Sequence, residues 1–158
     1  MRAIAYLVWC DIRFETGGFG LDHLSVYTDG ASRGNPGPAA IGYVMYDSAG
    51  NLFEEGAKCI GRRTNNEAEY EALLWAIERT RERTCSHVSF FTDSELVAKQ
   101  HDGGYTARDD RMKRYAMRVK ANEKLFKSFS LKNVPRDNPR IRLVDQLVNK
   151  ALDRECAR

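Results

Sequence analysis

The chain has 158 residues, of which 42% are hydrophobic and 30% charged, with a net charge of +3 and a pI of about 8.7. This length fits one compact domain with a single core. No apolar run approaches the roughly 20 residues that cross a bilayer, which excludes a membrane-spanning helix. The mild basicity permits a polyanionic partner without requiring one.

The first 23 residues form an N-terminal extension of unknown role. Their apolar run, residues 3–10, loosely resembles a signal peptide, but it is short, lacks an A-x-A-like exit and meets Asp11 and Arg13 at once. We therefore do not expect a cleaved signal. An extra strand, a flexible extension and an upstream start codon all stay open.

A glycine cluster at residues 16–20 marks a weak boundary, and the main domain is expected over residues 24–154. Alternating apolar residues and turn signals predict the first three strands, at residues 24–28, 41–46 and 52–60. Gly, Asn and Pro are dense between the first two strands, so residues 30–38 are expected to form a loop.

The second half alternates helices and strands. Thr64 and Glu67 form a possible capping box at the start of a helix over residues 64–83. Five further elements are expected: a strand at 88–92, helices at 94–100 and 109–127, a strand at 129–134, and a helix at 142–154. The order predicts an α/β fold, with a mixed five-stranded sheet and helices packed on both faces.

Four carboxylates occupy positions that suggest chemistry. Asp29 and Asp93 each follow an apolar strand that ends in Thr, so parallel strands would bring both to one sheet edge. Glu69 lies on the apolar stripe of its helix, where an uncompensated acid costs several kcal/mol. Asp145 is expected to open the last helix. Each acid also has a plain alternative, as a turn residue, a cap or a partner of the helix dipole.

A metal site would explain all four acids together. Mg²⁺ prefers oxygen ligands, and two ions about 4 Å apart can assist in-line phosphoryl displacement. Without metal, converging acids would raise one another's pKa. The cysteines Cys10, Cys59, Cys85 and Cys156 are scattered, with no CxxC pair and no histidine at zinc spacing. We therefore expect no zinc and no disulfide framework, but free thiols in a reducing cytoplasm.

Spaced motifs resemble those of type 1 ribonuclease H, in the bacterial and archaeal subgroup without a hybrid-binding domain. They are YTDGASRGNPGP at residues 27–38, TNNEAEY at 64–70, TDS at 92–94, the segment 100–114, VPR at 134–136 and DQLVNKA at 145–151. The resemblance covers about residues 24–152. It implies a ribonuclease H-like fold. It also implies an endonuclease activity that hydrolyses the RNA strand of RNA/DNA hybrids and leaves 5′-phosphate and 3′-hydroxyl ends.

The resemblance also implies residue roles. Asp29, Glu69, Asp93 and Asp145 would hold two Mg²⁺ or Mn²⁺ ions, and Arg136 would either engage the scissile phosphate or be a plain surface residue. The residues expected along the hybrid are Gly30, Ser32, Asn35, Thr64, Asn65 and Asn66. Asn both donates and accepts hydrogen bonds, as does the 2′-hydroxyl that distinguishes RNA from DNA. No obligate protein partner and no membrane are implied, and a cytoplasmic monomer is expected.

Two departures from the family pattern concern the closing segment. Arg136 stands in the region where many relatives carry a loop histidine, and residues 137–144 are about two residues longer than usual. Asp145 is therefore the least secure of the four acids, and Asp153 is an alternative that falls late in the helix. The helix at 109–127 is rich in basic residues, which either follow phosphates or form a solvated face.

Three rival functions are compatible with the sequence. The first is a non-catalytic module that binds RNA/DNA hybrids on the same fold. The second is a DNA nuclease or recombinase, against which the Asn pair and the Gly-Asn-Pro-Gly loop argue. The third is an acid-rich structural domain without a ligand, which would show no magnesium-dependent thermal shift.

Overall fold

A computed structural model describes residues 21–84, 86–104, 106–154 and 156, so most of the predicted extension lies outside the described residues. One mixed sheet has the order β3-β2-β1-β4-β5. Its strands are β1 (His23–Ser32), β2 (Gly37–Tyr46), β3 (Leu52–Arg63), β4 (His87–Thr92) and β5 (Ser128–Asn133). The first three strands pair antiparallel, whereas β4 runs parallel to both β1 and β5.

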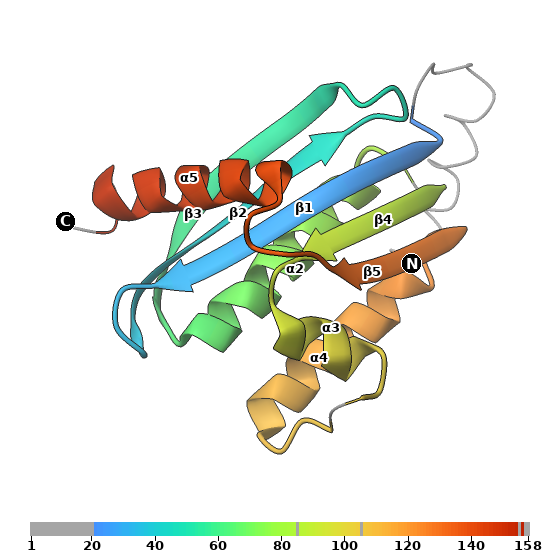
Figure 1. The fold of residues 1–158 in the computed structure, drawn as a ribbon. Helices are drawn as coiled ribbons and strands as arrows, with labels where there is room; N and C mark the ends of the chain where they lie inside the picture. The colour runs from blue at the N-terminus through green and yellow to red at the C-terminus, as the bar shows by residue number, and fades with distance from the viewer. Residues whose placement is uncertain (1–20, 85, 105, 155, 157–158) are drawn as a thin grey trace.

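Helices cover both faces of this sheet (Figure 1). One face carries α2 (Asn65–Arg81), α3 (Glu95–His101) and α4 (Asp110–Glu123), and the other carries α5 (Pro139–Arg154). The predicted α/β class, with a five-stranded mixed sheet and helices on both faces, is confirmed. None of the helices among the described residues is long and apolar enough to span a membrane.

The apolar residues form a core layer on each side of the sheet. Along β1, Leu24 and Val26 face α2 while Tyr27 faces α5, as the two-residue period of a strand requires. The α2 side also buries Leu73, Ile77, Val88 and Phe90. The α5 side also buries Val44, Ile141, Val144, Val148 and Leu152.

β1 and β2 are longer than the sequence predicted. Gly30 pairs with Ile41 and Ala31 with Ala40, and the Arg33 amide donates to the Pro38 carbonyl at 2.8 Å, so much of the expected loop at 30–38 is strand. Cross-strand pairing overrides the turn preference of these residues, because strand propensity depends on context. Asp29 therefore lies inside β1 and not after its end.

The helix ends agree with prediction at α2 and depart from it at α4 and α5. The capping box is confirmed, since the Thr64 hydroxyl accepts from the Glu67 amide and the Glu67 carboxylate accepts from the Thr64 amide. α4 stops at Glu123, four residues before the predicted end, although Phe126 beyond it is still buried in the core.

α5 begins at Pro139, three residues before the predicted start. The Asn138 side chain accepts from the amides of Arg140 at 2.9 Å and Ile141 at 3.3 Å, which makes Asn138 the N-cap and Pro139 the first helical residue. Asp145 consequently lies almost two turns into α5, and the expectation that it opens the helix was wrong.

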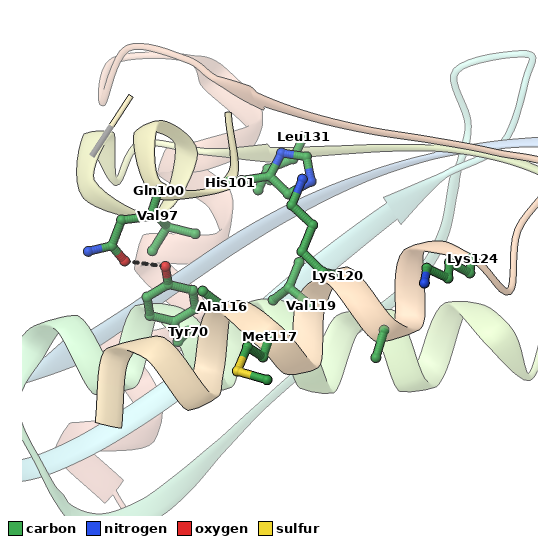
Figure 2. A pocket seen from close by; sticks show the side chains of 11 residues that line it. Tyr70, Val97, Gln100, His101, Ala116, Met117, Val119, Lys120, Lys124 and Leu131 are labelled. Carbon is green, nitrogen blue, oxygen red and sulfur yellow. Dashed lines mark hydrogen bonds between the residues drawn. The ribbon is translucent and has the colours of Figure 1, made fainter. Parts of the chain in front are cut away.

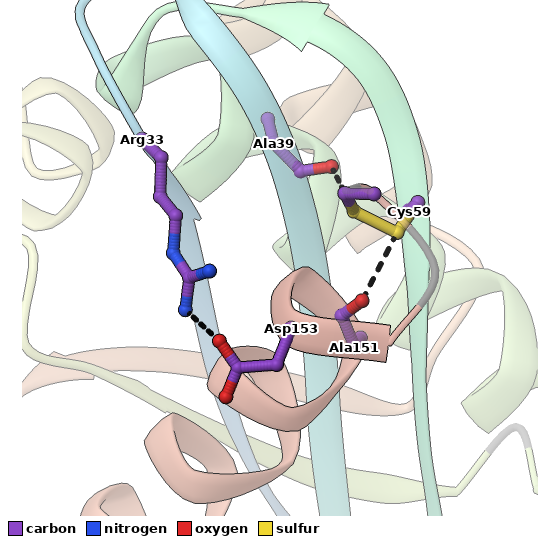
Figure 3. Close-up of a disulfide and its surroundings, with 6 residues drawn as sticks. Arg33, Ala39, Cys59, Ala151 and Asp153 are labelled. Atoms are coloured by element: carbon purple, nitrogen blue, oxygen red, sulfur yellow. Dashed lines mark hydrogen bonds and ion pairs between the residues drawn. A yellow bond between two sulfur atoms is a disulfide. The ribbon is translucent and has the colours of Figure 1, made fainter. Parts of the chain in front are cut away.

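The expectation of free thiols was wrong for two of the four cysteines. Cys59 on β3 and Cys156 after α5 form a disulfide, with Cα atoms 5.9 Å apart and a sequence separation of 97 (Figure 3). Beside it, Arg33 and Asp153 form an ion pair between the β1–β2 connection and the end of α5. Cys10 and Cys85 lie outside the described residues.

Replacing Cys156 by Ser should lower the free energy of unfolding by about 2–4 kcal/mol, because the disulfide closes a long loop that otherwise adds conformational entropy to the unfolded chain. Urea denaturation under non-reducing conditions measures the change. The Cys59→Ser variant and the double variant should lose the same amount as the single variant. A double variant that loses clearly more would show that the two sulfurs act separately.

Candidate active site

Asp29 and Asp93 lie side by side at one edge of the sheet. β1 and β4 are parallel, and Thr28 is in register with Thr92, so the next residue of each chain carries its carboxylate to the same place. The prediction that parallel strands bring these two acids together is confirmed. Beyond Asp93, Ser94 caps α3 by accepting a hydrogen bond from the Val97 amide at 3.3 Å, which turns the chain away from the sheet.

Glu69 reaches the same place because Gly30 lets α2 touch β1. A Cβ atom added at Gly30 would lie 2.2 Å from the Ala68 carbonyl oxygen and 2.8 Å from the Glu69 amide nitrogen. Backbone atoms cannot yield to such a contact, so only glycine fits here. Gly30, expected along the hybrid, therefore has a structural role in bringing Glu69 next to Asp29.

The three acids form a tight group. Asp29, Glu69 and Asp93 each offer one carboxylate oxygen, and these oxygens all lie within 4.8 Å of one another. Asp29 and Glu69 are each 6% exposed. Oε2 of Glu69 is buried and has no hydrogen-bond partner among the described residues. A buried carboxylate oxygen without a partner is costly, so the site is incomplete as a purely structural cluster.

Burial and mutual repulsion disfavour the charged forms of these acids. Burial, followed by the charge of Asp93, raises the pKa of Asp29 to about 7. Burial, followed by the charges of Asp29 and Asp93, holds the pKa of Glu69 well above its usual range. A divalent cation would reverse both effects, because an opposite charge close by favours the ionised carboxylate.

The donor set fits a hard divalent ion. Carboxylate oxygens are the ligands that Mg²⁺ and Mn²⁺ prefer, and Mg²⁺ sites commonly combine few protein carboxylates with waters and phosphate oxygens. The unpartnered Glu69 oxygen gives such an ion a ligand already in place. The chemistry of these residues therefore fits the metal that the resemblance implies.

Asp145 lines the same cavity, which has a volume of about 470 Å³, but it lies outside the close group of three. Its charge nevertheless contributes to raising the pKa of Asp29. Arg142, three residues earlier on α5, also lines the cavity. Sequence reasoning did not identify Arg142, although it stands three residues before Asp145 and both lie within the helix expected at 142–154, so the i to i+3 spacing was already available as a signal.

Arg136 reaches the site from the segment after β5. The Val134 amide donates to the Thr92 carbonyl at 2.9 Å, which holds this segment against the end of β4. Nε of Arg136 then lies 3.3 Å from Oδ2 of Asp93. The Arg136 side chain is 92% exposed and that of Asp93 is 8% exposed, so the guanidinium group stands at the mouth of the cavity with most of its donors in solvent.

The residues expected along the hybrid gather beside the acids. The Asn65 amide donates to Oδ1 of Asn35 at 3.1 Å, and the Ser32 amide donates to Oδ1 of Asn65 at 3.4 Å. Thr64 caps α2, and Asn66 is exposed on the first turn of that helix. Asn65 lines the cavity with the acids, whereas Asn35, Thr64 and Asn66 lie outside its lining.

Two other sequence expectations are clarified by the structure. Asp153 pairs with Arg33 and does not line the acid cavity, so it does not replace Asp145. On α4, several of the basic side chains contact acids: Arg111 contacts Glu67 at 3.1 Å, Lys113 contacts Asp110 at 3.9 Å, and Lys120 contacts Glu123 at 3.8 Å. Part of this helix is thus a charge-paired face.

Comparisons with known proteins agree with this geometry. A family model described as reverse transcriptase-like matches residues 27–151. A ribonuclease HI of Halobacterium salinarum is 45% identical over 130 residues, which are 80% of this chain and 63% of that relative. The bifunctional protein Rv2228c of Mycobacterium tuberculosis is 31% identical over 129 residues, and the matched part is 35% of its length. The chain thus spans less than two thirds of these curated relatives.

Solved structures match the fold. The crystal structure of ribonuclease H1 from Halobacterium salinarum NRC-1 gives a TM-score of 0.79 at 40% identity, covering 83% of this chain and 98% of that chain. LC11-RNase H1, solved in complex with an RNA/DNA hybrid, gives 0.76 at 36% identity, covering 82% and 96%. The ribonuclease H-like fold that the motifs predicted is confirmed.

The Asp29→Asn variant should be more stable than the native chain in the absence of divalent ions at about pH 8. The pKa of Asp29 is about 7 in the folded chain and near 4 when unfolded, so the folded state binds more protons between these values. The raised pKa of Asp29 should therefore remove about 1.4 kcal/mol of stability per pH unit as the pH rises through this window, and the raised pKa of Glu69 acts in the same direction. Urea denaturation across the window measures the loss.

Asp110, whose side chain is 86% exposed, provides a matched control. The Asp110→Asn variant should follow the native pH profile. If the Asp29→Asn variant is less stable than the native chain at about pH 8 without metal, the repulsive site inferred here is wrong.

Proposed function

The chain belongs to the reverse transcriptase-like family, and from that premise we propose that it is a ribonuclease H, an endonuclease that hydrolyses the RNA strand of RNA/DNA hybrids. The observation that carries the proposal is the buried group of Asp29, Glu69 and Asp93, with an unpartnered oxygen on Glu69. Relatives that bear the name ribonuclease H, and the hybrid bound by one of the similar structures, support it.

We assign Asp29, Glu69, Asp93 and Asp145 to hold two Mg²⁺ or Mn²⁺ ions. When bound, such ions supply an activated water and stabilise the leaving oxygen of an in-line displacement. The burial of Asp29 and Glu69 fixes the direction of their carboxylates before the substrate arrives. Cleavage on the 3′-oxygen side of the phosphate leaves a 5′-phosphate and a 3′-hydroxyl.

Arg136 is assigned to the scissile phosphate. Its contact with Asp93 positions the guanidinium group at the mouth of the acid cavity, and its exposed donors match the oxygens of a phosphate. Asp93 would then have two tasks, as a metal ligand and as the residue that orients Arg136. With a cation held by Asp93, the attraction of Asp93 for Arg136 would be weaker, and the guanidinium group of Arg136 would be available for the substrate.

The hybrid is proposed to lie across the start of α2 and the β1–β2 connection. The carboxamide oxygens of Asn35 and Asn65 accept from backbone amides, so their NH₂ groups are left to donate to the substrate. Asn66 is exposed on the same turn and would contact a 2′-hydroxyl in the minor groove. Ser32 and the Gly30 backbone are assigned to contacts with the same RNA strand of the hybrid.

Thr64 is assigned to a phosphate of the DNA strand. Its hydroxyl oxygen accepts from the Glu67 amide, which leaves the hydroxyl proton to donate to a phosphate oxygen.

In addition, residues 24–154 are proposed as the catalytic domain and residues 1–23 as a separate extension. A monomer in the cytoplasm without an obligate protein partner also stays a prediction.

The Asp93→Asn variant should cleave a labelled RNA/DNA hybrid about a thousandfold more slowly in Mg²⁺, because losing one ligand costs several kcal/mol of transition-state stabilisation. Asp145→Asn tests the least secure ligand in the same assay. Duplex DNA of the same sequence is the substrate control and should not be cut. Normal cleavage by Asp93→Asn would overturn the proposal, and binding without turnover by the native chain would favour a non-catalytic hybrid-binding module.

The Asn66→Ala variant should bind the hybrid about fivefold more weakly, because one hydrogen bond to the minor groove contributes about 1 kcal/mol. Fluorescence anisotropy of a labelled hybrid in Ca²⁺ measures the affinity. The thermal shift caused by Mg²⁺ should stay as in the native chain, since Asn66 does not line the acid cavity. Unchanged hybrid affinity would contradict the groove assignment.

A further inference from the structure

A second cavity of about 360 Å³ lies between α3 and α4, on the face of the sheet opposite α5 (Figure 2). We call it the α3–α4 groove. The apolar side chains that line it are Val97, Ala116, Met117, Val119, Ala121 and Leu131. It shares no lining residue with the acid cavity, so the proposed chemistry does not account for it.

One large apolar side chain of the groove, that of Met117, is left largely in contact with solvent. Met117 is 70% exposed, whereas Val97, Val119 and Leu131, which also line the groove, are buried. Two lysines on the same helix, Lys120 and Lys124, stand among the lining residues (Figure 2). Lys120 contacts Glu123 at 3.8 Å, which offsets one of the two charges. The surface is therefore an apolar strip with a net positive charge at one end, a combination that suits an apolar segment followed by a net negative one.

The described chain begins close to the lysine end of the groove. Leu21 packs against the core cluster that also contains the groove residues Val97, Val119 and Leu131, so it lies on the same face of the sheet. The His87 amide donates to the Asp22 carbonyl at 3.0 Å, and the Ser128 amide donates to the Ser86 carbonyl at 3.2 Å. These contacts place the starts of β1 and β5 two strand spacings apart, about 10 Å.

The preceding segment has the length and the composition to fill the groove. Residues 3–10 are eight consecutive apolar residues, including Trp9, and they are followed by Asp11, Arg13 and Glu15, which together carry a net negative charge. Ten residues, 11–20, separate the run from Leu21 and can span at most about 33 Å. The groove along α4 from Ala116 to Lys124 is about 12 Å long, so the apolar run reaches all of it.

We propose that residues 3–10 of this chain occupy the α3–α4 groove of the same molecule, with Asp11 and Glu15 beside Lys120 and Lys124. This docking removes Met117 from water together with an apolar run that would otherwise be solvated. It gives the extension a role in covering the helical face of the domain, apart from the acid site.

Cys10 provides a direct test, because it ends the apolar run. In a Cys85→Ser background of the full chain, Met117→Cys should form an intramolecular disulfide with Cys10 when diamide is added as oxidant. Leu52→Cys is the matched control. Leu52 is 49% exposed at the start of β3, two strands from β1 on the opposite side, so it is equally within reach of the extension.

We expect the cross-link at position 117 to form roughly tenfold faster than at position 52, because docking raises the effective concentration of the two thiols. Non-reducing peptide mapping identifies the bonded pair, and hybrid cleavage at the native rate before oxidation confirms the fold. If Met117→Cys does not fold, Ala121→Cys repeats the test on the same wall of the groove.

Equal rates at positions 117 and 52, or no cross-link at either, would overturn the proposal. A cross-link between two molecules would also overturn it and assign the groove to a second copy of the chain. As a second test, Lys120→Glu and Lys124→Glu together should slow cross-linking at position 117 severalfold, whereas an unchanged rate would contradict the pairing with Asp11 and Glu15.

Discussion

The mutual repulsion of three buried carboxylates is the constraint on which the site depends. Asp29 on β1, Glu69 on α2 and Asp93 just after β4 repel one another when they are charged. Their positions are fixed instead by contacts outside the acids themselves. The glycine at position 30 lets α2 touch β1, and parallel pairing holds β4 beside β1. The backbone contacts between α2 and β1 and between β1 and β4 thus offset the repulsion among the three carboxylates.

Much of this centre could be predicted because its signals are local. Each Thr-Asp pair follows a run of apolar residues that is recognisable as strand, and Glu69 stands on the buried stripe of a helix whose capping box is also visible in the sequence. Periodicity determines which face of a strand or helix a residue occupies. Because the position of each acid follows from the face or the end of its helix or strand, predicting the helices and strands was nearly sufficient to predict that three of the acids lie close together.

The errors arose where distant contacts override local preference. Residues 30–38 contain turn-forming residues, yet the pairing of β1 with β2 extends β1 through Ser32 and begins β2 at Gly37. The start of α5 was placed too late, although Asn138 and Pro139 are a typical N-cap and first helical residue. The pairing of Cys59 with Cys156 had no signal in the sequence, because it depends on where the end of α5 meets β3.

That disulfide also gives the chain a closed covalent topology. The ring that it completes includes Glu69, Asp93 and Asp145, whereas Asp29 lies on the open arm before Cys59. A single backbone cut anywhere between Cys59 and Cys156, for example in the connection between α3 and α4, leaves both fragments bonded to each other. Three of the four acids therefore stay on one molecule after proteolysis within the ring, and the fourth stays attached through β1, β2 and β3.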